Sequence, residues 1–145
     1  MPISITLITT IAMAATLPQA HVTRIEHRGA AYEVSYEPQL QTRMKTVGLS
    51  AGPRPSTERC RWSADVQVRR VIRREGAEGG HERVLPAIDR IEGSRFGSCR
   101  TAKEAVLNDQ NARLDRLRGR MAEVAGRDRL AVIADIDSAR GLAVN

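Results

Sequence analysis

The sequence predicts an α+β fold, in which a small antiparallel β-sheet of three to five strands packs against a long C-terminal helix and a second, shorter helix. Two observations predict it. Apolar and polar residues alternate over much of 21–97, whereas 101–141 carry the three- and four-residue spacing of helices. We therefore expect a single α+β domain over 21–145, mainly β before Gly97 and mainly α after it.

The first strands are predicted from alternation and from the breaks between alternating segments. Residues 22–27 and 31–37 alternate on either side of Gly29, which supplies the positive φ of a tight turn, so we expect a β-hairpin here. A third short strand is expected at 44–49. The prolines that follow predict a loop at 50–57.

The clearest strand is predicted from Cys60 to Arg73, because period-two alternation persists over its whole length. Its predicted apolar face consists of Cys60, Trp62, Ala64, Val66 and Val68. A glycine-containing turn at 76–80 leads to an antiparallel return strand at 82–92. Pro86 within that strand favours an edge position or a bulge.

The long helix is predicted from Thr101 to Ala125, with Thr101 and Glu104 forming a capping box and Gly126 ending or bending the helix. Its predicted apolar stripe consists of Leu107, Leu114, Leu117, Met121 and Val124. Roughly two and a half heptads, interrupted by Gln110, are too few for a coiled coil. We therefore expect the stripe to pack on the protein's own sheet and the protein to be a monomer.

A second helix is predicted over 127–140, with Asp128 as its N-cap and Gly141 closing it. Its predicted apolar side consists of Leu130, Ile133, Ala134 and Ile136. No internal repeat of solenoid or propeller length is present.

The N-terminus has the pattern of a secretory signal peptide. Residues 3–17 are uncharged and weakly apolar, and the run is too short to cross a bilayer as a helix, which takes about 20 apolar residues. We expect cleavage after Ala20, or as a second choice after Ala14, so that 1–20 are removed and the protein is periplasmic or secreted, with no transmembrane span in the mature chain. Because no Lys or Arg precedes the run, the alternative is a buried N-terminal segment of a cytosolic protein.

The chain has two cysteines. In an exported protein this number indicates one structural disulfide, and we expect Cys60 and Cys99 to form it, which would join the best strand to the long helix. Reactive thiols are the alternative, although the sequence has no CxxC pair.

The net charge of +6 and a pI near 10.3 predict attraction to anionic partners. The candidate binding residues are a cluster at the end of the clearest strand, namely Arg69, Arg70, Arg73 and Arg74. Alternation divides these arginines between two faces, and nearby glutamates neutralise part of their charge. A solvated strand end is therefore the favoured interpretation and a phosphate site the alternative.

The common catalytic motifs GxSxG, GxGxxG, HExxH and the Walker loop are absent, so we predict no catalytic residue and no cofactor. Aromatic residues make up only 3%, which leaves little to stack on bases, and we expect no nucleic-acid partner. The favoured function is a non-catalytic exported protein that binds a protein or an anionic envelope component. The alternative is a small exported enzyme, or a copper protein that uses His21 as its new N-terminus.

Overall fold

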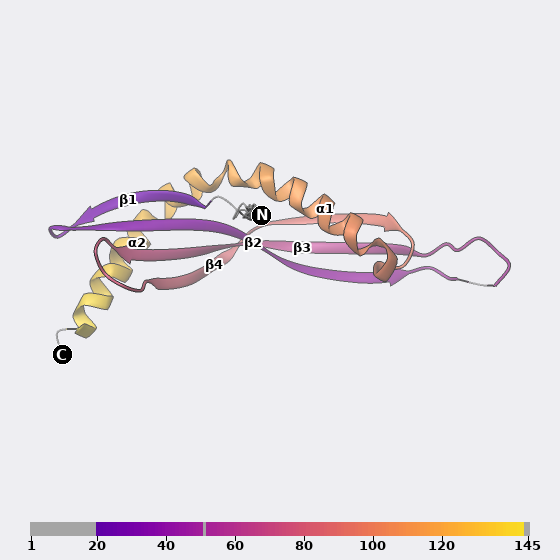
Figure 1. Cartoon of the computed structure of the whole chain (residues 1–145), viewed down its shortest axis with the longest axis horizontal. Coiled ribbons are helices and arrows are strands. Elements are labelled where there is room, and N and C mark those ends of the chain that lie inside the picture. Colours follow the sequence, from indigo (N-terminus) through magenta and orange to yellow (C-terminus); the bar gives the residue numbers. More distant parts are fainter. Residues whose placement is uncertain (1–19, 51, 144–145) are drawn as a thin grey trace, which may run out of the picture.

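The computed structural model describes residues 20–50 and 52–143, which form a long, twisted antiparallel sheet and two helices (Figure 1). The strands are β1 (His21–His27), β2 (Ala30–Val47), β3 (Arg59–Arg74) and β4 (His81–Phe96), and they lie in the order β1-β2-β3-β4. The helices are α1 (Cys99–Arg118) and α2 (Met121–Ala143). This architecture confirms the predicted α+β fold. Apart from Ala20, the predicted signal peptide lies outside the described residues.

β2 is one strand of 18 residues, where we expected separate strands at 31–37 and 44–49. β2 continues without a break because β1 pairs with only part of its length. Within the described residues, β1 pairs with β2 only as far as Tyr36, so beyond that residue β2 has a free edge on this side. A proline costs little on a free edge because no ladder hydrogen bond is lost there, and Pro38 therefore does not interrupt the strand.

β3 lies between β2 and β4, and its successive side chains point to opposite faces of the sheet. Its even-numbered residues from Cys60 to Ile72 are buried, and the residues between them are partly or fully exposed. The predicted apolar face is confirmed, and the buried positions continue beyond Val68 with Arg70 and Ile72. We call this the covered face, since both helices pack on it, and we call the opposite side the open face.

β4 is the edge strand of the sheet beside β3. Its register shifts between Val66, which pairs with Asp89, and Val68, which pairs with Leu85. Pro86 falls within this irregular stretch. The edge position and the bulge that Pro86 predicted are therefore both present.

The two helices meet at Gly119 and Arg120, and the predicted break at Gly126 is wrong. The capping box is also wrong, because α1 begins at Cys99 and the side chain of Ser98 accepts the hydrogen bond from the Thr101 amide. Gly126 lies inside α2, where a glycine costs about 1 kcal/mol and packing of the surrounding turns outweighs it. No helix in the described part of the chain has the length and hydropathy needed to cross a bilayer.

The buried faces of the helices differ from the predicted stripes by a small rotation. The buried residues of α1 are Ala102, Val106, Gln110 and Leu117, and those of α2 include Met121, Ala125, Val132 and Ile136. Leu107 is 42% exposed and Leu130 is 80% exposed, so both lie outside the core. Sequence spacing identifies a face only to within about one residue, and the contact with the sheet determines which neighbour is buried.

α1 and α2 cover different lengths of the sheet. α2 packs with β1 and the first half of β2 over a cluster that includes Val34, Val68 and Val132. α1 packs on the other end, over a cluster that includes Trp62 and Val106. The predicted disulfide between Cys60 and Cys99 is present, with the two Cα atoms 4.6 Å apart, and it joins β3 to the start of α1. Closing a loop of this length stabilises the fold by about 4 kcal/mol in the chain-entropy model.

Substitution of Gly93 tests the packing of the sheet where α1 covers it. It lies opposite Trp62, and a Cβ placed on it would be 2.5 Å from two carbon atoms of the indole ring. We expect Gly93→Ala to displace the ring and to lower the free energy of unfolding by about 1–3 kcal/mol, as overpacking does. Urea unfolding followed by emission of Trp62, the chain's only tryptophan, measures both effects.

The matched control is Gly126→Ala, since no atom of the described residues lies within 4 Å of a Cβ at that position. We expect this change to stabilise the helix by up to about 1 kcal/mol. A Gly93→Ala protein as stable as the wild type, with unchanged emission, would contradict the packing of Trp62 across β4.

Candidate functional site

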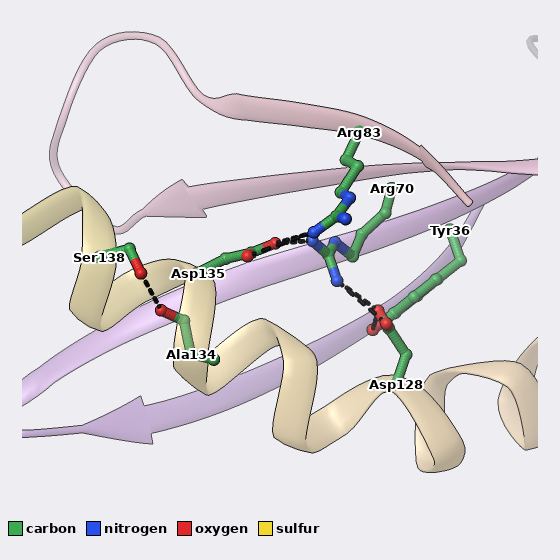
Figure 2. Close-up of polar contacts among 7 residues, drawn as sticks. All are labelled: Tyr36, Arg70, Arg83, Asp128, Ala134, Asp135 and Ser138. Carbon is green, nitrogen blue, oxygen red and sulfur yellow. Dashed lines mark hydrogen bonds and ion pairs between the residues drawn. The ribbon is translucent and has the colours of Figure 1, made fainter. Parts of the chain in front are cut away.

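Arg70 is completely buried between β3 and α2, which is unusual for an arginine. Its Nη1 donates hydrogen bonds to both carboxylate oxygens of Asp128, at 3.0 and 2.8 Å, and its Nη2 donates to Asp135. Figure 2 shows the Arg70 guanidinium between these two aspartates of α2. Because they are seven residues apart, they lie two turns apart on one face of the helix. Since α2 begins at Met121, Asp128 lies inside the helix and its predicted N-cap role is wrong.

Tyr36 and Arg83 complete this group, which we call the buried cluster after Arg70 at its centre, although the Arg83 side chain is 57% exposed. Arg83 of β4 donates to both carboxylate oxygens of Asp135 at 3.4 Å, and the hydroxyl of Tyr36 donates to Asp128 at 3.1 Å (Figure 2). Burial, and then the negative charge of Asp128, raise the pKa of Tyr36 well above its usual range, so Tyr36 acts as a neutral donor. Two guanidinium groups balance two carboxylates. The arrangement attaches α2 to the sheet and offers no free base.

Removing Arg70 tests this structural role. In Arg70→Met, two partly buried carboxylates lose their shared partner, and we expect the free energy of unfolding to fall by about 3–5 kcal/mol. Arg83 still pairs with Asp135 in this variant, so adding Asp128→Leu to Arg70→Met removes the carboxylate that has lost its cationic partner and should restore part of that loss. Urea denaturation of the three proteins measures the effect, and a loss below about 1 kcal/mol in Arg70→Met would contradict this role.

The structure does not bring the four sequence-predicted arginines together. Arg69 lies on the open face, where its Nε and Nη2 each donate to Glu82 at 2.7 Å and its Nη1 donates to Glu37 at 3.5 Å. The hydrogen bond from Arg69 holds the pKa of Glu82 below its usual range. Arg73 and Arg74 are exposed at the end of β3, and Arg70 is buried. These residues therefore have three separate environments.

The histidines are dispersed as well. His21 is half-buried at the start of β1, and the centre of its ring lies 6.5 Å from the centre of the Tyr36 ring. His27 bonds through Nε2 to Asp137 at 2.8 Å, and this contact lowers the pKa of Asp137. Over residues 20–50 and 52–143, no group of three or more His, Cys, Asp or Glu side chains is placed to hold a metal ion.

The open face contains a hollow of about 550 Å³ that sequence reasoning missed. Its floor is the backbone of Met44, Trp62 and Gly93, which are neighbours across β2, β3 and β4. Met44 and Trp62 pack in the core under α1, so the residues on either side of them point away from the helices. These flanking residues form what we call the basic hollow: Arg43, Lys45, Arg61, Ser63, Glu92 and Ser94.

The charges of the basic hollow are unbalanced. Arg43, Lys45 and Arg61 are exposed, and within the described residues none of them lies within 4.0 Å of a carboxylate oxygen. Glu92, in contrast, is paired with Arg90 at 3.2 Å. Three positive charges therefore surround the hollow, and none of them has a carboxylate partner among residues 20–50 and 52–143.

Strand register is what brings these cations together. Lys45 lies directly opposite Arg61, and Arg43 lies opposite Ser63, although 16 positions separate Lys45 from Arg61 in the sequence. One signal could have revealed the site. If β2 is taken to continue to Val47, pairing it with the alternating residues of β3 places 43–45 beside 61–63. We expected that strand to end at 37 and another to begin at 44, so the register between 43–45 and 61–63 was not apparent.

Comparison of the chain with protein-family models, with curated proteins and with solved structures gives no match. The function must therefore be inferred from the buried cluster and the basic hollow themselves. The carboxylates of the buried cluster have hydrogen-bond partners within the protein, whereas Arg43, Lys45 and Arg61 of the basic hollow have no carboxylate partner in the described part of the chain. The basic hollow is thus the better candidate for a binding site.

Proposed function

We propose that this is a non-catalytic exported protein that binds an anionic component of the cell envelope through the basic hollow. The observation that carries the proposal is that Arg43, Lys45 and Arg61 surround an open hollow without carboxylate partners among the described residues. Export is supported by the apolar N-terminal run and by the disulfide between Cys60 and Cys99, which persists in oxidising compartments.

The arrangement of these cations costs stability, which supports a binding role. Like charges directly opposite one another on neighbouring strands are destabilising, and Lys45 and Arg61 are such a pair. Arg69 and Arg95, in contrast, are each paired with a carboxylate, that of Glu82 and that of Asp109. A residue pattern that breaks a local rule without a structural gain is typical of a functional site. A bound anion would relieve the repulsion.

The test compares two triple variants with the same change in charge. Arg43→Gln/Lys45→Gln/Arg61→Gln removes the cations of the basic hollow, and a control removes three exposed cations of α1: Arg100→Gln/Lys103→Gln/Arg116→Gln. Each variant lowers the net charge from +6 to +3. Binding to phosphocellulose at increasing NaCl is the measurement, because screening weakens exposed charge interactions.

We expect the hollow variant to bind at least about tenfold more weakly than the wild type at low salt, and the control variant to remain within about threefold. The difference should shrink as salt rises. If both variants lose the same affinity, binding depends on net charge alone and the basic hollow is not the site.

A further inference from the structure

We infer that the basic hollow takes the phosphate group of an anionic phospholipid, and that the protein therefore rests on a membrane surface by this end of its sheet. The inference rests on the proposed function and adds the chemical class of the ligand. Two features carry it. The first is the set of donors in the hollow, and the second is a group of exposed apolar side chains beside it.

The donors in the hollow suit a phosphate group. Arg43 and Arg61 each present a planar fork that matches phosphate oxygens, and Lys45 adds a compact charge. Ser63 and Ser94 line the same hollow and supply hydroxyl groups. A volume of about 550 Å³ exceeds what one phosphate ion fills and lies within the range of organic ligand sites. A phosphate carrying a glycerol group fits this space better than the free ion does.

Exposed apolar side chains lie at the same end of the sheet. Phe96 follows Ser94 by two residues on β4, so it belongs to the open face, and it is 80% exposed. The guanidinium carbon of Arg59 lies 4.3 Å from its ring centre. Leu49 lies near the start of the connection from β2 to β3 and is 75% exposed. Figure 1 shows this connection projecting beyond the sheet.

Cations beside exposed apolar groups are typical of proteins that bind membrane surfaces, where basic side chains attract anionic headgroups and apolar side chains enter the boundary with the acyl chains. A phosphorylated ligand in solution would account for the cations but would leave Phe96 and Leu49 in water. A lipid surface accounts for both features. It is therefore the source of phosphate that the observations favour.

The experiment measures co-sedimentation of the protein with vesicles of phosphatidylcholine alone or with about one third phosphatidylglycerol. We expect binding only to the anionic vesicles. Each basic residue near such a surface is worth about fivefold in affinity, so the triple glutamine variant of the basic hollow should bind about 100-fold more weakly, and the α1 control variant within about threefold of the wild type. Phe96→Ser/Leu49→Ser should weaken binding about tenfold, mainly at high salt, where the apolar contact is the larger contribution.

A parallel titration with glycerol 3-phosphate separates the lipid inference from the proposed function. Suppose that the protein binds glycerol 3-phosphate through the hollow cations and yet fails to bind anionic vesicles. That result overturns the membrane inference and leaves the proposed function standing. Vesicle binding that is unchanged in Phe96→Ser/Leu49→Ser also overturns the membrane seating. If neither anionic vesicles nor phosphocellulose distinguishes the hollow variant from the α1 control, both proposals are overturned. All substituted residues are exposed, and thermal unfolding of each variant verifies that the fold is intact.

Discussion

The burial of β3 on only one of its two faces determines where the helices pack and on which side of the sheet the polar residues lie. Every second residue from Cys60 to Ile72 is buried, so both helices pack on that side of the sheet. The disulfide from Cys60 to Cys99 starts α1 on the same side, and the turn at Gly119 lets α2 continue along the sheet. The intervening residues of β3 face away from the helices. Strand pairing with β2 and β4 extends that polar surface over the width of the sheet, where it forms the basic hollow.

The same constraint explains why arginines close in sequence have different roles. Arg70 occupies a position of the covered face, where burial of an unpaired charge would be prohibitive, and Asp128 and Asp135 of α2 compensate it. Arg69, one residue earlier, lies on the open face and pairs with Glu82 and Glu37. Position on the sheet, more than residue type, therefore separates a structural cation from a surface cation.

The sequence predicted the fold class, the covered face of β3 and the turn regions because alternation and its breaks are local signals, and it predicted the disulfide because two cysteines allow one pairing within the chain. It did not predict the continuity of β2 through Pro38, which depends on where β1 stops pairing. It placed the helix break at Gly126 instead of Gly119 because glycines at both positions are compatible with a break, and packing on the sheet decides between them. The basic hollow depends on the register of three strands, which the sequence of any one strand does not reveal.

The proposed function requires that anions bind on the open face at the basic hollow. The most direct measurement is an NMR titration of the ¹⁵N-labelled protein with glycerol 3-phosphate, following each backbone amide. We expect the largest chemical-shift changes at 43–45, 61–63 and 92–94, with little change at 69–74 or along α1. Changes concentrated at 69–74 or spread evenly over the exposed arginines would contradict it.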